Sequence, residues 1–292
     1  WWEVSGMGNL LSAGMYRLLR SKVFYVGILA MIFLEVWVIS NSRQGSYFVE
    51  GLESQNLFSF NMFVPLGLAV FCGLFIGEEH TSNALRNQLI VGHSKAKVYL
   101  ANLLLSALAG LSYFAVSAVS GLLFGLATGS ELQFEALELG CYFFLSLCAV
   151  LGAASLSALL ANLFTSRSMG VVVSLLLAIG LLFFAGNLSN TMSEPETIPQ
   201  YRPIEQLIGD TTTLVYAADP TLPEVPNPAY PQGAWRVILE FLWNFLPACQ
   251  GTRLTEVSIT AEAFFPLLGY AALFIVLTTA AGLAIFQRKD VK

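Results

Sequence analysis

The sequence predicts an all-α membrane protein with six transmembrane helices, and three observations lead to this fold class. Hydrophobic residues make up 56% of the 292 residues and charged residues 11%, whereas soluble domains have about 45–50% and 25%. Several apolar runs approach the ~20 residues that a helix needs to cross a hydrocarbon core. Basic residues alternate between successive loops. A net charge of −5 without a basic stripe excludes a nucleic-acid-binding protein.

Uninterrupted apolar length gives the spans of a single transmembrane domain, residues 1–292. They are expected at about 23–40, 57–77, 98–128, 137–164, 168–186 and 263–286.

Orientation follows from the lysines and arginines, because basic residues are retained on the cytoplasmic side. Ten of the fourteen fall on one side of the six spans, and both termini are then cytoplasmic. These ten are Arg17, Arg20, Lys22, Arg86, Lys95, Lys97, Arg167, Arg288, Lys289 and Lys292.

Residues 7–22 precede the first span and predict a helix that lies in the membrane interface. At 100° per residue, an apolar half faces a polar half that contains Arg17 and Arg20. With these two residues and Lys22 toward the cytoplasm, the helix is expected to rest on the inner leaflet and to turn sharply into the first span at Ser21.

Glu35 is the one carboxylate well inside a span, which makes it a candidate functional residue. It either reaches the outer interface, close to Asn41, or faces the bundle interior, where it could meet cargo. The four cysteines are not spaced as a disulfide framework, and we expect no intramolecular bridge.

Residues 78–97 form a polar cytoplasmic loop that is too long for a simple turn. Glu78 and Glu79 would open a short helix, because carboxylates suit the positive end of the helix dipole, and Gly92 would end it. Leu85 and Leu89 would share its buried face. Such a helix across the mouth of two spans offers a surface on which a partner protein can push, with Arg86 as a bidentate contact.

This loop resembles the loop between spans two and three in permeases of the type-2 ABC exporter family. The resemblance rests on the run from Leu85 to Leu89, on Gly92, and on Ser94, Lys95, Lys97 and Tyr99 leading into a span. The interfacial helix, the six spans and the long outer segment extend it over nearly the whole chain. Family members commonly carry Gly-Thr before the Leu/Ile-Arg pair, where this chain has Asn83-Ala84.

The resemblance implies that this loop carries a coupling helix, which docks on a separate nucleotide-binding subunit. ATP and Mg would bind that subunit and not this chain. A second permease subunit would complete a homo- or heterodimer, and the resemblance implies the cell membrane of a bacterium. The implied docking residues are Glu78, Glu79, Thr81, Asn83, Leu85, Arg86, Asn87 and Leu89.

Residues 187–262 are the longest polar segment and are expected outside the cell. Eight prolines between residues 195 and 231 indicate a largely irregular or extended chain there. From Trp235 to Leu246, apolar residues recur at helical spacing, which predicts an amphipathic helix at the outer leaflet with Trp235 and Trp243 as anchors. This segment is either a lid or exit surface, with Phe241 and Phe245 as candidate gate residues, or a brace for the sixth span.

The sequence lacks the residue patterns that several kinds of catalysis require. It has no Gly-Lys-Ser/Thr phosphate loop and no Gly-x-Ser-x-Gly elbow. Its two histidines, His80 and His93, lie in the cytoplasmic loop, so no metal site inside the membrane can use them. We therefore expect a chain that is not itself an enzyme.

Two functions from different classes remain. In the first, the chain is the permease of an ATP-driven exporter for an amphipathic or hydrophobic cargo such as an antimicrobial peptide, a drug or a lipid-like molecule. In the second, it is a membrane scaffold or sensor that binds a ligand through the outer segment. Binding of an ATPase to the 78–92 loop distinguishes them.

Overall fold

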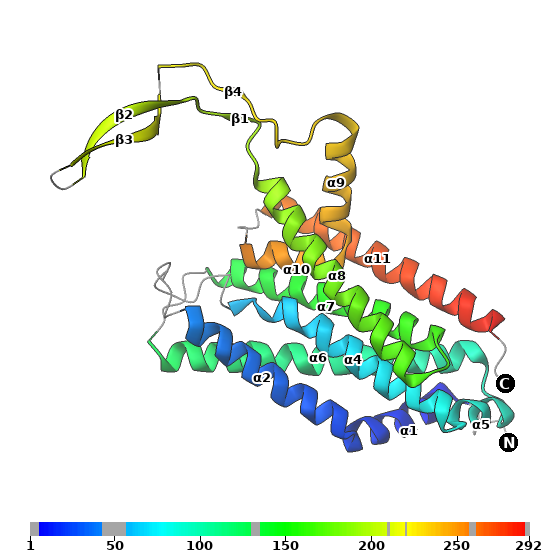
Figure 1. Cartoon of the computed structure of the whole chain (residues 1–292). Coiled ribbons are helices and arrows are strands. Elements are labelled where there is room, and N and C mark those ends of the chain that lie inside the picture. Colours follow the sequence, from blue (N-terminus) through cyan, green and yellow to red (C-terminus); the bar gives the residue numbers. More distant parts are fainter. Residues whose placement is uncertain are drawn as a thin grey trace.

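A computed structural model describes residues 6–42, 57–129, 135–208, 211–219, 221–256 and 261–289. Within these ranges the chain forms a helical bundle with two short β-ladders at one end (Figure 1). The helices are α1 Met7–Arg20, α2 Lys22–Ser42, α4 Phe60–Thr81, α5 Ala84–Ile90, α6 Lys95–Ala127, α7 Ala136–Leu163, α8 Arg167–Ser193, α9 Gly233–Phe245, α10 Pro247–Glu256 and α11 Ala261–Arg288.

Six of these helices are long and apolar enough to cross a membrane, namely α2, α4, α6, α7, α8 and α11. The predicted all-α membrane fold is therefore confirmed. The α8 helix continues to Ser193, seven residues past the expected end of the fifth span. It can continue because the prolines of the outer segment begin only at Pro195.

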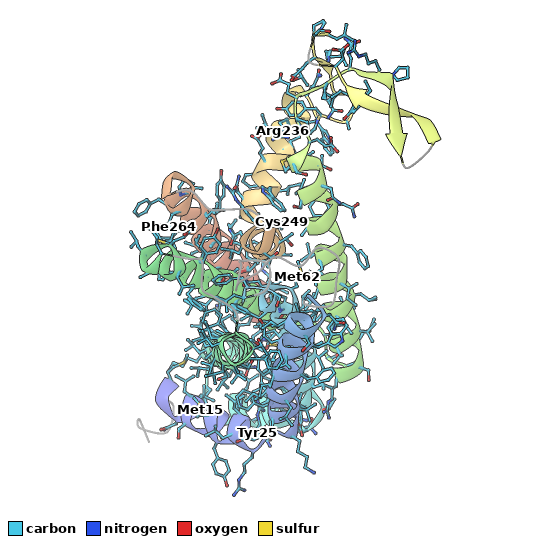
Figure 2. All side chains as sticks on the ribbon, turned by 90° about the vertical axis from the view of Figure 1, so that its left-hand side faces the viewer. Met15, Tyr25, Met62, Arg236, Cys249 and Phe264 are labelled. Atoms are coloured by element: carbon cyan, nitrogen blue, oxygen red, sulfur yellow. The ribbon has the colours of Figure 1, made fainter. Side chains whose placement is uncertain are left out.

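The bundle has two distinct ends (Figure 1). At the first, α5 lies beside α1 and the C-terminal end of α11; we call this the α5 end. At the second, α10 packs on the bundle, and α9 and the strands project from it; we call this the hairpin end. Figure 2 shows the hairpin standing clear of the packed side chains, with Arg236 between it and Cys249.

The strands lie in the segment that was expected to be largely irregular or extended. Strand β2, Tyr201–Ile208, pairs antiparallel with β3, Thr211–Ala218, in the register Tyr201↔Ala218 to Ile208↔Thr211. Strand β1, Thr197–Ile198, pairs with β4, Val225–Pro226. The prolines are accommodated because an isolated two-stranded ribbon has free edges, where a missing N–H costs no ladder bond.

Helix α4 lies at the centre and packs against α2, α6, α7, α8 and α10. Its approach to α8 is close because glycines line it. A Cβ on Gly73 would lie 2.7 Å from the Cα of Val171, and one on Gly77 would lie 2.9 Å from the Cα of Arg167. Small residues permit such backbone contact between spanning helices.

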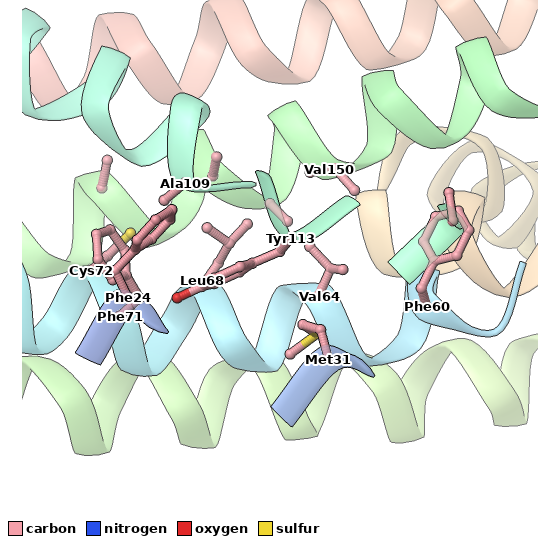
Figure 3. Packing of buried hydrophobic residues seen from close by; sticks show 14 of the residues in the cluster. Phe24, Met31, Phe60, Val64, Leu68, Phe71, Cys72, Ala109, Tyr113 and Val150 are labelled. Carbon is pink, nitrogen blue, oxygen red and sulfur yellow. The ribbon is translucent and has the colours of Figure 1, made fainter. Parts of the chain in front are cut away.

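The main core surrounds α4 and is rich in aromatic rings. Tyr113 of α6 is fully buried and extends toward Phe71 and Phe24, as Figure 3 shows. Its ring stacks on Phe24 at a centroid distance of 5.9 Å and meets Phe71 edge-on at 6.2 Å. Its hydroxyl lies against Gly27 of α2, where a larger residue would collide with it. These contacts fix α2, α4 and α6 relative to one another.

Candidate functional site

Helix α5 sits at the α5 end as a seven-residue element, Ala84–Ile90. The expected helix from Glu78 to Gly92 is not formed as one unit, since Glu78, Glu79 and Thr81 belong to the last turns of α4. The break lies at Ser82 and Asn83, where Asn83 takes a left-handed conformation with φ 58°. Asparagine tolerates this conformation better than most residues.

One face of α5 packs against the bundle. Leu85 is 2% exposed and lies in an apolar cluster contributed by α1, α6 and α11. Its buried partners are Leu10, Val98, Tyr99, Ala101 and Phe286. Leu85 was expected on the buried face of this helix, and it is buried. It was also among the docking residues that the resemblance implied, and its burial assigns it instead to holding α5 in place.

The opposite face of α5 is exposed. Ile90 is 73% exposed and Val91 56% exposed, and the side chains of Arg86 and Asn87 are also at the surface. Thr81 and Asn83 are exposed as well, while Leu89 is half-buried. Two large apolar side chains beside a guanidinium, on a short helix outside the spans, form a surface suited to a protein partner.

Glu79 was also expected on the docking surface, but it faces the bundle interior. It is 4% exposed and forms an ion pair with Arg17 of α1, at 2.7 Å between Oε1 and Nη1. The Arg17 guanidinium also lies over the ring of Phe75, 3.8 Å from its centroid. Glu79 lies in the last turn of α4. Its pairing with Arg17 therefore ties α1 to the end of α4, which α5 follows in the chain.

This ion pair continues as a network through the asparagines of two spans. Asn102 of α6 donates to Glu79 Oε2 at 2.8 Å and to Asn162 Oδ1 of α7 at 3.4 Å. Lys289 donates to the carbonyl oxygens of Asn162 and Leu163, at the end of α7, at 2.9 and 3.1 Å. Burial lowers the pKa of Lys289. The network joins α1, α4, α6, α7 and the end of α11.

Sequence reasoning missed Asn102, Asn162 and Lys289 as members of one site. Asn102 and Asn162 could have indicated the site, because a polar amide inside an apolar span usually has a hydrogen-bonding partner. That their partners are Glu79 and each other depends on how α4, α6 and α7 pack.

An open apolar cavity of about 440 Å³ lies between α2 and α4, with contributions from Tyr113 and from Leu175 of α8. Lys22 lines it at the α5 end and is the one charged residue in its wall. Arg20, the other basic residue of the expected interfacial segment, is exposed and lies over the ring of Tyr16. The remaining wall is aliphatic or aromatic, and includes Val26, Met31, Leu34, Phe63, Leu66 and Val70.

Glu35 does not reach the outer interface, as one of the two readings had it. It is 1% exposed and accepts a hydrogen bond from Ser59 at 3.1 Å. Its Oε1 lies against Gly121 of α6, where a Cβ would be 3.1 Å away. Glu35 therefore faces the bundle interior, away from the apolar cavity, in whose wall it does not lie.

Helix α9 is amphipathic, and its protein-facing side is formed by residues other than those of the expected membrane-facing side. Leu239 and Trp243 are buried against α8 and α10, at 6% and 7% exposed. Trp235 and Phe241 are 59% and 44% exposed. Trp243 is therefore not an interfacial anchor. Phe245 is half-buried and links Phe241 to α11. Its ring stacks on that of Phe241 at a centroid distance of 5.1 Å and meets the ring of Phe274 edge-on at 5.2 Å.

The composition of α9 allows it to present apolar residues on two sides. Apolar residues occupy more than half of its circumference, so its apolar arc is wider than a single contact can cover. Leu239 and Trp243, one turn apart, are the pair that reaches the α8 surface, and the remaining apolar residues stay outside.

Comparison with protein families gives a match to the model described as ABC-2 family transporter protein, over residues 10–186. The match contains α1, α2, α4, α5, α6, α7 and most of α8, so it includes the polar network up to Asn162 and the apolar cavity. No curated protein matches the chain.

Proposed function

Because this chain belongs to the ABC-2 family of transporter proteins, we propose that it is the membrane-spanning permease subunit of an ATP-driven exporter. A separate nucleotide-binding subunit, which carries ATP and Mg, supplies the energy. The chain itself is not the ATPase. Two permease subunits enclose the path, each with its own ATPase subunit.

The exposed face of α5 is the observation that carries this proposal. Ile90, Val91 and Arg86 lie outside the spans with no partner among the described residues. An ATPase subunit docked there would bury the two apolar side chains and pair the guanidinium with a carboxylate. Closure of the two ATPase subunits on ATP would then move both α5 helices and switch the path between inward and outward access.

The apolar cavity between α2 and α4 supports an amphipathic or hydrophobic cargo. Its wall has a single charge, at the α5 end, and a small inorganic ion would find no polar ligands along it. At the hairpin end, Trp235 and Phe241 offer further exposed apolar surface on the route outward. Antimicrobial peptides, hydrophobic drugs and lipid conjugates all match this chemistry.

In this arrangement the α5 end faces the cytoplasm and the hairpin end faces outward. The basic residues support it, since Arg86, Lys95, Lys97 and Arg288 all lie at the α5 end. Arg20 and Lys22 then support a position of the end of α1 at the inner leaflet, whereas Arg17 is paired with Glu79 inside the bundle.

The test is affinity purification in a gentle detergent, with identification of co-purifying proteins and an ATPase assay. We expect a P-loop ATPase to accompany the wild-type chain. Arg86→Glu and Ile90→Asp should each reduce its recovery at least about tenfold, which corresponds to about 1.4 kcal/mol of binding free energy. Leu85 is unsuitable for this test because its substitution would disturb the buried cluster.

Leu137→Asp is the matched control for Ile90→Asp. Leu137 is 81% exposed and also lies at a helix end, but at the far end of the bundle. It should retain the ATPase. A chain that purifies alone in several detergents, without ATPase activity, would contradict the exporter and favour the scaffold or sensor.

A further inference from the structure

A cavity of about 200 Å³ lies beneath α5, between α1, α4 and α6. Four charged or amide side chains line its wall, whereas the cavity between α2 and α4 has one, Lys22. The four are Arg17, Glu79, Gln88 and Asn102, and they come from all four helices. The cavity therefore separates α5 from the polar network that joins the spans.

Arg17 uses only part of its hydrogen-bonding capacity. Its Nη1 is taken by Glu79, whereas its Nε and Nη2 are buried and have no partner among the described residues. These two atoms form the side-on edge of the guanidinium, which presents two parallel donors. Buried donors without partners are rare, because each loses its hydrogen bonds to water without a replacement, which costs free energy.

Gln88 of α5 is in the complementary situation. Its Oε1 is a buried acceptor without a partner among the described residues, and it lines the same cavity as Arg17. An acceptor on α5 and two donors on α1 thus lie around one shared space of about 200 Å³.

We propose that Arg17 is the positioning residue that connects α5 to the spans: Glu79 holds its guanidinium in place, and its free donors bind Gln88 when α5 moves into the cavity. The inference rests on the proposed function, in which α5 is displaced by the ATPase. It adds the residues through which that displacement reaches α1, α4, α6 and α7.

The physical reason is the cost of separating buried charges. Arg17 cannot leave Glu79 without leaving a buried carboxylate without its counter-charge, so α1 and the end of α4 move together. Asn102 extends the same constraint to α6 and α7 through its bonds to Glu79 and Asn162. A hydrogen bond from Arg17 to Gln88 adds α5 to this unit in one of its two positions.

The first experiment measures ATP-dependent uptake of a fluorescently labelled amphipathic peptide into inverted membrane vesicles, together with recovery of the ATPase. Arg17→Lys keeps the ion pair but lacks the side-on edge, and Gln88→Leu keeps the size but lacks the acceptor. Each should lower transport at least tenfold with undiminished ATPase recovery. The double variant should lie within about twofold of the single variants, because both remove one interaction.

Gln88→Glu, which keeps the acceptor, should transport like the wild type, and so should Gln287→Leu, a matched control at an exposed glutamine of the same end. Independent losses that multiply to about a hundredfold in the double variant would overturn the proposal, as would wild-type transport by Gln88→Leu.

The second experiment does not require the ATPase. Arg17→Cys with Gln88→Cys is oxidised in detergent and compared with Ser12→Cys with Gln88→Cys, in which Ser12 is an exposed residue of α1. A disulfide needs Cα atoms within about 7 Å, so its formation reports closure of the cavity. We expect the first pair to form the bond at least ten times faster.

Equal rates for the two pairs would overturn the movement of α5 toward Arg17, whether or not an ATPase is found. A fast cross-link in a chain that recruits no ATPase would uphold this movement and count against the proposed function alone.

Discussion

At the scale of single residues, polar side chains fix the positions of the segments outside the apolar core. Asp219, at the base of the hairpin, accepts hydrogen bonds from the hydroxyl and the backbone N–H of Thr221 at 2.6 and 2.9 Å. It also pairs with Arg202 at 3.1 Å. The hydrogen bonds from Thr221, chiefly that of its hydroxyl, and then the Arg202 charge lower the pKa of Asp219.

This lowered pKa predicts how the base of the hairpin responds to acid. A carboxylate with a depressed pKa in the folded state stabilises that state above its unfolded pKa, near 3.9, and the stabilisation is lost as pH falls below that value. Hydrogen exchange in residues 197–203 and 218–226, corrected for intrinsic rate, should therefore increase several-fold between pH 5 and pH 3. Asp219→Asn should remove this pH dependence; the same acid response in that variant would refute the role of Asp219.

At the scale of elements, the outer helices are held by a small number of large side chains. Trp243 joins Leu239 in a cluster with Ala185 and Leu188 of α8 and with Cys249 of α10. The start of α10 is fixed by Gln250, which donates to the carbonyl of Asn244 at 2.6 Å. Helix α9 is thus anchored along one face, and its other apolar face is left for lipid, cargo or a partner.

Two tryptophans of the same helix give a matched comparison. Trp243→Ala removes a 7%-exposed ring and should destabilise the protein by about 3 kcal/mol or more. Trp235→Ala removes a 59%-exposed ring and should change stability by about 0.5 kcal/mol or less. Thermal unfolding in detergent, followed by fluorescence-detected gel filtration, measures both. Similar losses for the two variants would contradict the arrangement of α9.

At the scale of the whole molecule, the two ends of the bundle have different structural features. The α5 end holds the polar network, the exposed face of α5 and most of the basic residues, while the hairpin end holds α9, α10 and the strands (Figure 1). Six spans between them place the two ends on opposite sides of a membrane.

This separation predicts opposite accessibilities to a membrane-impermeant maleimide in intact cells. Trp235→Cys should be labelled from outside, and Ile90→Cys only after permeabilisation. Background is low because Cys72, Cys148 and Cys249 are buried, and Cys141→Ser removes the half-buried one. Burial also raises the pKa of Cys249 to about 12, which suppresses its reactive thiolate. Labelling of Ile90→Cys in intact cells would contradict the proposed orientation, in which the α5 end faces the cytoplasm.

The sequence by itself determined the all-α fold, the six spans and the α9 helix near residues 235–246. These features depend on apolar length and on periodicity along the chain, which are local properties. The residue pattern did not predict the β2–β3 hairpin or α10. Eight prolines in the surrounding segment obscured any strand or helix periodicity there.

Only the tertiary structure decided which way individual side chains face. A span that is apolar around its whole circumference gives no sign of its buried face, so the inward position of Glu35 could not be read from α2. Glu79 and Leu85 were grouped with the docking residues because they share a loop with Arg86 in the sequence. Their burial depends on Arg17, Asn102 and Phe286, which lie in three other helices and meet them only in the folded bundle.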